Sequence, residues 1–352
     1  MKKTLFLILS VFLAGGAVVA ESPVVKIPWF APLSLQIPLI AKEKGFDQEF
    51  GIDLKLINIT RASEAVQALL TGDVDVTFSP FLTAETATLK GAKIKGFIMA
   101  YYGGDKFALV TMKKTGITRI EDLAGKTIAV PGLGAPPELF VRMVAAMKGI
   151  RPDSYKLVQQ ALDMIPTSLA TGQIDAGMLF EPNLTAFMSK QDGVVILTRG
   201  VDIPAINFVP NAYWVREDRL QKDNELIYKV YLTLAKAEWY IRTKGPDSDE
   251  ILSIVGKATN MPVAVFKPSA DKNIWDPRIK PVQIEGMKEE AKFFVDMGKL
   301  ERVVSIPDLW DNSFYVRARL EHPELFADLD GYLQRLKKNG IVKDEDFQAE
   351  VK

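Results

Sequence analysis

The sequence predicts an α/β fold made of two lobes with a ligand cleft between them. Strand and helix patterns alternate along the chain from Val24 onward, as in doubly wound α/β proteins. One segment also occurs twice, because Ala65–Pro80 is echoed by Ile165–Pro182. In each copy a helix ends at Thr-Gly, a short apolar strand follows an Asp, and the strand runs into a Phe-x-Pro loop. Open α/β sheets bind ligands beyond the carboxyl ends of their strands, so two such loops predict a site between two lobes.

Residues 1–20 predict a cleaved signal peptide. A charged start at Met1–Lys3 precedes an apolar stretch at Leu5–Leu13, and small residues stand before a cut ahead of Glu21. The chain contains no cysteine, which a lipoprotein would need at the cut. We therefore expect secretion into the periplasm, with no membrane anchor.

Composition narrows the range of partners. With 48% hydrophobic residues the chain can bury the cores of two lobes without disulfides. The 44 basic residues are balanced by 44 acidic ones, so no net field gathers nucleic acid or anionic lipid. We expect a monomer that binds a small molecule and no nucleic acid.

The elements of the first lobe follow from local patterns. Gly51 turns the chain from a helix into a strand with alternating faces, and Thr60 is a suitable cap for the next helix. In chain order we expect a strand at Val24–Ile27, a helix at Ser34–Phe50, a strand at Ile52–Ile57, a helix from Thr60 to Thr71, and strands at Lys93–Met99 and Phe107–Met112.

The second lobe starts with the strand Thr127–Val130 and ends near Val194–Leu197. Two β-rich runs, Phe107–Met112 and Ala205–Val215, are expected to cross between the lobes as a two-strand hinge. The remaining third of the chain is mostly helical and should pack on the first lobe, since no linker-like segment separates it. Its expected helices are Asn224–Thr243, Ser248–Thr259 and Val282–Gly298. The predicted domains are thus 21–112 with 206–352 for lobe 1, and 113–205 for lobe 2.

Five segments in this order resemble one protein family. They are Ile40–Leu54, Leu69–Asp75, Ile120–Val130, Thr171–Ala176 and Trp275–Arg278. The chain resembles the extracytoplasmic solute-binding proteins of ABC importers, in the group that includes nitrate, sulfonate, taurine and thiamine-pyrimidine binders. The resemblance implies a type II-like periplasmic-binding-protein fold that closes on a small molecule and presents it to a membrane permease. It implies no cofactor and does not name the ligand, because the shared segments are scaffold.

The end of the first strand offers aromatic side chains for a ligand. Trp29 and Phe30 stand between two prolines, and Ser34 opens the next helix. In a cleft the rings would present a flat apolar face, or Phe30 lies in the core instead. The thiamine-pyrimidine branch is similar in having Trp followed by Pro, but the Asn and His that it places next are absent here, which disfavours a pyrimidine.

The loops after the two repeated strands supply polar candidates. Ser79, Phe81 and Thr83 offer two hydroxyls and a ring, or serve as turn and cap residues. Glu181 either meets solvent or holds an amine, a ring N–H or a hydroxyl of the ligand. The remaining candidate ligand-binding residues are Arg61, Tyr101, Tyr102, Gly134, Glu138 and Asn207.

The turn Gly132–Glu138 bears on the charge of the ligand. It follows a strand and opens a helix, where backbone amides usually hold anions. Here two prolines remove two amide donors and Glu138 adds a negative charge. The sequence thus favours a neutral or cationic ligand, aromatic or heterocyclic, such as a pyrimidine-like or vitamin-precursor compound. Arg61 is the main argument against a neutral or cationic ligand, since its guanidinium could pair with a ligand carboxylate. A sulfonate, nitrate or carboxylate anion is the alternative.

Catalysis finds little support in the sequence. The single histidine, His322, stands in the helical tail, so no Ser-His, Cys-His or histidine-rich metal arrangement is expected near the cleft. We expect no catalytic residues and no metal. A pyrimidine-synthase-like enzyme and a soluble ligand sensor remain alternatives.

Overall fold

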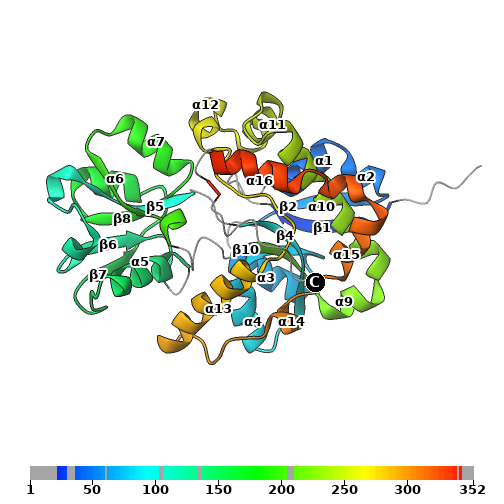
Figure 1. Cartoon of the computed structure of the whole chain (residues 1–352), viewed down its shortest axis with the longest axis horizontal. Coiled ribbons are helices and arrows are strands. Elements are labelled where there is room, and N and C mark those ends of the chain that lie inside the picture. The colour runs from blue at the N-terminus through cyan, green and yellow to red at the C-terminus, as the bar shows by residue number, and fades with distance from the viewer. Residues whose placement is uncertain are drawn as a thin grey trace, which may run out of the picture.

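The computed structural model describes residues 22–29, 36–59, 62–102, 106–133, 136–203, 210–338 and 341–342. Figure 1 shows two α/β lobes side by side, with the helical tail of the chain placed on the larger lobe. The two-lobed α/β fold predicted from the sequence is confirmed.

The larger lobe contains two sheets. In the first, β1 (Val24–Trp29) and β2 (Asp53–Asn58) pair in parallel. In the second, β10 (Pro210–Arg216) lies between β3 (Thr77–Pro80) and β4 (Ile94–Tyr102) and is antiparallel to both. A strand from late in the chain thus completes the sheet of the first lobe, as predicted for the return of the chain.

Twelve of the described helices cover these sheets. They are α1 (Gln36–Glu43), α2 (Phe46–Glu49), α3 (Ala62–Thr71), α4 (Phe81–Leu89), α9 (Glu217–Lys222), α10 (Asn224–Lys244), α11 (Asp249–Thr259), α12 (Val263–Phe266), α13 (Pro281–Asp296), α14 (Ile306–Leu309), α15 (Ser313–Glu321) and α16 (Leu329–Lys338). The single helix predicted up to Phe50 is divided into α1 and α2 because Gly45 adopts a left-handed conformation, with φ 70°.

The smaller lobe has a five-stranded sheet in the order β7-β6-β8-β5-β9. Its strands are β5 (Phe107–Met112), β6 (Thr127–Val130), β7 (Lys156–Gln159), β8 (Ala176–Phe180) and β9 (Val194–Arg199), and its α-helices are α5 (Pro136–Met147), α6 (Ile165–Thr171) and α7 (Asn183–Lys190). Short 3-10 helices are η2 (Lys113–Thr115), η3 (Ile120–Leu123) and η4 (Gly200–Asp202) here, and η5 (Lys267–Ser269) and η6 (Pro323–Phe326) in the larger lobe.

The placement of β5 corrects the sequence prediction. We expected Phe107–Met112 to cross from the first lobe, but β5 lies inside the sheet of the smaller lobe, between β8 and β9. All six of its residues are buried, because Leu109 and Val110 enter the cores on opposite faces of this sheet. The chain still passes between the lobes twice, between Tyr102 and Lys106 and between Ile203 and Pro210.

The sequence repeat has the same structural role in both lobes. In the larger lobe a carboxylate oxygen of Asp75 accepts a hydrogen bond from the Lys26 amide at 2.8 Å, and the Asp75 amide donates to the Lys26 carbonyl at 2.9 Å. In the smaller lobe Asp175 makes the same pair of contacts with Thr127, at 2.8 and 2.9 Å. Each Asp therefore ties the residues just before a repeated strand to another strand of the same lobe, β1 in the larger lobe and β6 in the smaller one.

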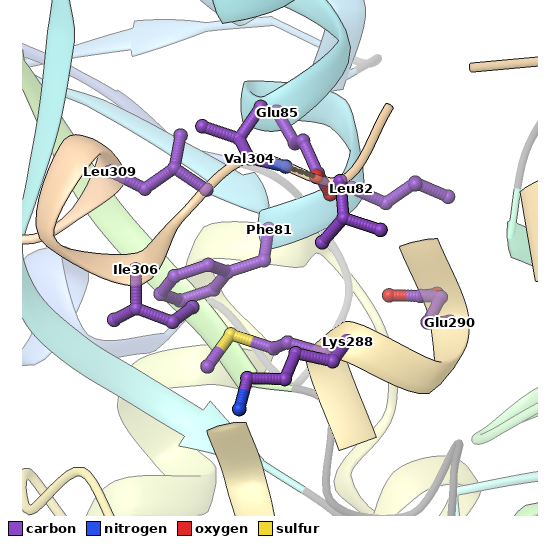
Figure 2. Close-up of a pocket in the computed structure, with 10 residues that line it drawn as sticks. Phe81, Leu82, Glu85, Lys288, Glu290, Val304, Ile306 and Leu309 are labelled. Atoms are coloured by element: carbon purple, nitrogen blue, oxygen red, sulfur yellow. Dashed lines mark hydrogen bonds between the residues drawn. The ribbon is translucent and has the colours of Figure 1, made fainter. Parts of the chain in front are cut away.

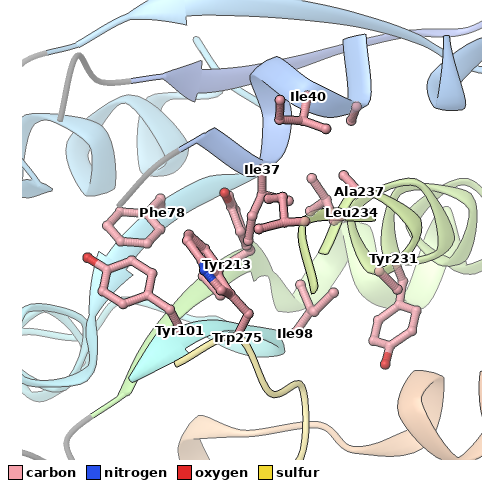
Figure 3. Close-up of a cluster of buried hydrophobic side chains, with 14 of the residues drawn as sticks. Ile37, Ile40, Phe78, Ile98, Tyr101, Tyr213, Tyr231, Leu234, Ala237 and Trp275 are labelled. Carbon is pink, nitrogen blue, oxygen red and sulfur yellow. The ribbon is translucent and has the colours of Figure 1, made fainter. Parts of the chain in front are cut away.

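The main core lies between β4, β10 and helix α10. Figure 3 shows Tyr213 and Trp275 beside Tyr101, with Leu234 of α10 packed from one side. The Trp275–Arg278 segment is tied to β4, because Ile274 and Tyr102 exchange backbone hydrogen bonds of 3.1 and 3.2 Å. The end of β4, which carries two predicted site residues, is thereby held against the tail of the chain.

A fully buried ion pair supports the same region. Asp276 accepts from the Lys280 ammonium at 2.8 Å, and Arg278 donates to both oxygens of Asp276. Burial alone would raise the pKa of Asp276, but the charges of Lys280 and Arg278 outweigh it and hold the pKa below its usual value. Lys280 also lies 3.3 Å from the hydroxyl of Tyr102.

Candidate functional site

The two lobes meet at Lys106, where the chain leaves β4 for β5. The carbonyl of Lys106 accepts a hydrogen bond of 2.8 Å from the amide of Glu181, just beyond β8 of the smaller lobe. Its ammonium lies 4.3 Å from the ring centroid of Tyr101, near the end of β4 in the larger lobe. We refer to Tyr101, Lys106 and Glu181 as the lobe junction.

Lys106 is the basic residue of the lobe junction, and its pKa is strongly perturbed. Burial lowers the pKa of Lys106 to about 7, because a charged ammonium loses hydration there. The Tyr101 ring compensates in part, since its face attracts a cation. Near neutral pH this side chain can therefore act either as a cation or as a neutral amine. An anionic group placed beside it would favour the charged form.

The ring of Tyr101 is held in place by other aromatic side chains. It stacks on Phe78 at 5.9 Å between ring centroids and meets Trp275 edge-on at 5.6 Å. Figure 3 shows Phe78 and Trp275 on two sides of Tyr101. Such packing restricts the rotamer of Tyr101, which is 6% exposed, and its ring is a preorganised surface for Lys106.

Tyr102 differs from its neighbour, because successive residues of a strand point to opposite faces. Its side chain is fully buried and meets Lys280 in the ion-pair network beneath the sheet. The structure thus places Tyr101, and not Tyr102, against Lys106.

Trp29 lies at the end of β1 and is half-buried against the main core. Ser79 is fully buried, and its hydroxyl donates to the Pro80 carbonyl at 2.8 Å. Thr83 is half-buried on α4. Of these three, Trp29 best fits a surface for stacking.

Phe81 lies in the core, which corrects its predicted role. The side chain is 2% exposed, meets Trp214 edge-on at 4.9 Å and stacks on Trp310 at 5.7 Å. Figure 2 shows the ring enclosed by Ile306 and Leu309 from the α14 region. The sequence prediction missed this contact because α14 lies far away along the chain.

Each of the two predicted carboxylates has a partner four residues further along the chain. Glu138 is buried and pairs with Arg142 at 2.6 Å, one turn along α5. Glu181 accepts from the amide and the hydroxyl of Thr185 at 3.1 and 3.0 Å, which caps the start of α7. The charge that the sequence analysis assigned to Glu138 is thus compensated, and Glu181 contributes its amide to the lobe junction.

Five predicted site residues, Phe30, Ser34, Arg61, Gly134 and Asn207, lie outside the described residues. Sequence reasoning did not select Lys106. A lysine between a Gly-Gly-Asp sequence and an apolar strand carries no motif, and its importance comes from loss of hydration and from contact with both lobes.

Within the described ranges, no three His, Cys, Asp or Glu side chains gather as metal ligands. No helix there is long and apolar enough to cross a membrane. His322 ends α15, with its ring 3.3 Å from the carboxylate of Glu324. A surface groove of about 540 Å³ is lined by Arg278, Tyr315 and Phe326 among others, and it includes none of the predicted site residues.

The model of the NMT1/THI5-like family matches residues 36–248, more than half of the chain. A protein of Brucella abortus (strain 2308), provisionally named a binding protein, is 23% identical over 88% of this chain and 98% of its own length. The taurine-binding periplasmic protein of Escherichia coli (strain K12) is 26% identical over 79% of this chain and 86% of its own. A 4-amino-5-hydroxymethyl-2-methylpyrimidine phosphate synthase of Saccharomyces cerevisiae is 22% identical over 60% of this chain and 64% of its own.

Solved structures share the fold. The periplasmic aliphatic sulphonate binding protein SsuA from Escherichia coli superposes with a TM-score of 0.68 at 17% identity, covering 82% of this chain and 92% of its own. The periplasmic nitrate-binding protein NrtA from Synechocystis gives 0.69 at 12% identity, covering 90% and 99%. The predicted periplasmic-binding-protein architecture is thereby confirmed.

Proposed function

Since the chain belongs to the NMT1/THI5-like family and has the fold of periplasmic binding proteins, we propose that it is the soluble substrate-binding component of an ABC import system. In this role it closes on a small organic ligand in the periplasm and delivers it to a membrane permease. The observation that carries the proposal is the lobe junction, where Lys106 joins the ends of β4 and β8 across the two lobes. A ligand held there would contact both lobes and would favour their closure.

We propose that the ligand presents an anionic or hydrogen-bond-accepting group to Lys106 and an apolar or flat part to Tyr101 and Trp29. The half-buried Lys106 supports the first feature, because the loss of hydration that lowers its pKa leaves its charge poorly solvated before a ligand arrives. The packed ring of Tyr101 and the half-buried ring of Trp29 support the second. A small sulfonate or carboxylate with an organic body meets both requirements. The sulphonate and taurine binders among the relatives add support to this class.

The neutral or cationic heterocycle favoured by the sequence is the second candidate. The aromatic surface of Trp29 and Tyr101 supports it equally, and a neutral Lys106 can donate to a ring nitrogen. Its electrostatic basis is weaker than the sequence suggested, because Glu138 is paired with Arg142 and Glu181 caps α7.

We propose binding in preference to catalysis. The yeast relative is a synthase, so the family includes enzymes. In this chain the single histidine caps the end of α15 beside Glu324 and is not a residue of the lobe junction.

A thermal-shift screen of the secreted, ligand-stripped protein tests the proposal. The panel contains taurine, methanesulfonate, nitrate, hydroxymethylpyrimidine, thiamine and putrescine. A ligand at a hundred times its Kd stabilises by about 2.7 kcal/mol, which raises Tm by about 2–4 °C in a protein of this size. Stabilisation by a sulfonate that Lys106→Gln removes supports the first ligand class. Stabilisation by thiamine or hydroxymethylpyrimidine alone supports the second ligand class, the neutral or cationic heterocycle. Stabilisation by putrescine alone contradicts the proposal that Lys106 contacts the ligand.

A further inference from the structure

The two chain crossings between the lobes meet the smaller lobe side by side. The first crossing reaches it at Lys106, directly before β5, and the return crossing leaves it after Ile203, which follows η4. β5 and β9 are neighbours in the sheet, with Ala108 opposite Arg199, and η4 continues directly from Arg199. Figure 1 shows β5 on the side of the smaller lobe that faces the larger lobe. The start of β5 and η4 are thus the two points from which the crossings are directed.

Gly200 of η4 and Phe107 of β5 make a very close contact at this place. A Cβ atom added to Gly200 would lie 2.3 Å from Cζ of the Phe107 ring, and 2.5 and 2.8 Å from its two Cε atoms. Non-bonded carbon atoms prefer about 3.5–4.0 Å, so a side chain at position 200 requires a shift of about 1 Å or more. The φ of Gly200 lies outside the left-handed region, so its backbone conformation suits other residues as well. The ring of Phe107, and not the turn, therefore requires the glycine.

The ring of Phe107 has little room to move aside. It is 8% exposed, and it meets Phe140 edge-on at 5.0 Å and Phe180 at 5.4 Å between ring centroids. Phe107 and Phe180 are also paired in the ladder between β5 and β8, and the carbonyl of Lys106 accepts from the Glu181 amide at 2.8 Å. In such close packing, displacement of the ring is passed to the backbone of Phe107 and of its neighbour Lys106.

The other side of the contact is constrained as well. The Ile203 amide donates to the Gly200 carbonyl at 3.1 Å, and the carboxylate of Asp202 accepts from the Arg199 amide at 3.0 Å. Ile203 also belongs to the same core as Phe107. If η4 gave way instead of the ring, the start of the return crossing would therefore move. The contact between Gly200 and Phe107 thus sets the distance between the two crossings.

We propose that Gly200 is a positioning residue for the solute site: its lack of a side chain lets Phe107 pack on η4, and this contact holds Lys106 in the lobe junction. There the ammonium of Lys106 lies 4.3 Å from the ring centroid of Tyr101 and has lost the hydration that gives an exposed lysine a pKa of about 10.4. The importance of this placement rests on the proposed function, since Lys106 is the residue proposed to meet the solute.

The test compares Gly200→Ala with a matched control, Gly177→Ala. A Cβ atom at Gly177 would lie 2.6 Å from Cγ2 of Ile165, so the two substitutions are sterically similar. Ile165 belongs to the core on the opposite face of the sheet from Phe107. Both variants should therefore have a lower Tm than the parent, but only Gly200→Ala disturbs the crossings.

Two measurements are made on each variant. The pKa of Lys106 is measured without solute by NMR of lysine labelled with ¹³C at Cε, and the signal is assigned by its absence in Lys106→Gln. The Kd for methanesulfonate is measured by calorimetry at pH 6. Because the pKa needs no solute, it decides the role of Gly200 independently of the importer role. A parent protein that fails to bind methanesulfonate counts against the proposed ligand class alone.

In Gly200→Ala the pKa of Lys106 should rise from about 7 to about 8 or above, because displacement returns water to the ammonium. Its Kd should rise about tenfold or more, since binding groups need placement within about 0.5 Å. Gly177→Ala should keep the pKa and the Kd of the parent. A folded Gly200→Ala protein with the parent's pKa and Kd overturns the proposal. Equal changes in both variants also overturn it, since the cause would then be destabilisation of the smaller lobe as a whole.

Phe107→Leu tests the contact from its other partner, and it is the second variant if Gly200→Ala does not fold. Loss of the ring should also raise the pKa of Lys106, whereas Phe187→Leu, in the core on the opposite face of the sheet, should leave it unchanged. Where all variants fold, Gly200→Ala should change this pKa much less in the Phe107→Leu background, because the ring that the new methyl group meets is gone. An unchanged pKa in Phe107→Leu, or equal effects of Gly200→Ala in the two backgrounds, contradicts the role of this contact.

Discussion

Replacement of Lys106 by Gln should remove both the affinity for an anionic solute and most of its pH dependence. The ammonium of Lys106 is the part of the lobe junction that a sulfonate would contact, and burial places its pKa at about 7. An anion binds the protonated form, so affinity is present below pH 7 and is lost as pH rises above it.

The magnitude follows from the fraction of Lys106 that is protonated. With a pKa of about 7 the side chain is about nine-tenths protonated at pH 6 and about one-hundredth at pH 9. For a complex that retains the proton, affinity should fall about 90-fold over this range, or about 2.7 kcal/mol at 1.36 kcal/mol per pH unit.

Isothermal titration calorimetry with taurine or methanesulfonate at pH 6, 7, 8 and 9 measures this dependence. Lys113→Gln, on the exposed surface beyond β5, is the matched control and should retain the parent profile. A parent affinity that does not change between pH 6 and pH 9, or equal affinities for the parent and Lys106→Gln, would refute the role of Lys106.

Three further substitutions separate ligand contacts from scaffold. Trp29→Ala should raise Kd more than tenfold if the ring stacks on the solute, since such stacking is worth about 1–3 kcal/mol; an unchanged Kd in calorimetry places Trp29 in the scaffold. Phe81→Ala should reduce the free energy of unfolding by about 3–5 kcal/mol in a denaturant titration with Kd unaltered, because Phe81 packs on Trp214 in the core; weaker binding at full stability would return Phe81 to the site. Glu181→Ala should lower the free energy of unfolding, measured by thermal unfolding, by about 1 kcal/mol, because the hydrogen bonds to Thr185 at the start of α7 are lost. Glu181→Gln should lower it less. A selective loss of affinity in Glu181→Gln would instead show that Glu181 contacts the ligand.

Local sequence patterns were sufficient for most of the strands and for the repeat. The Thr-Gly helix ends depend on a few neighbouring residues and can be recognised in the sequence, because they need the left-handed conformation that Gly72 and Gly172 adopt, with φ 84° and 80°. The contacts of Asp75 and Asp175 join residues 49 and 48 positions apart, so only the structure identified their partners. The lobe assignment of β5 was harder, because a continuous apolar run does not say which sheet it enters.

The sequence by itself determined the two-lobed α/β class, the order of most elements and the family resemblance, because these depend on periodicity and on turn residues. Only the tertiary structure decided which candidate side chains are available to a ligand. Phe81 is covered by a segment more than two hundred residues later, Glu138 is neutralised by Arg142, and Lys106 gains its low pKa from burial where the lobes meet. Burial and charge pairing arise from contacts between distant segments, so the same residue types in the sequence could have been core, cap or binding site.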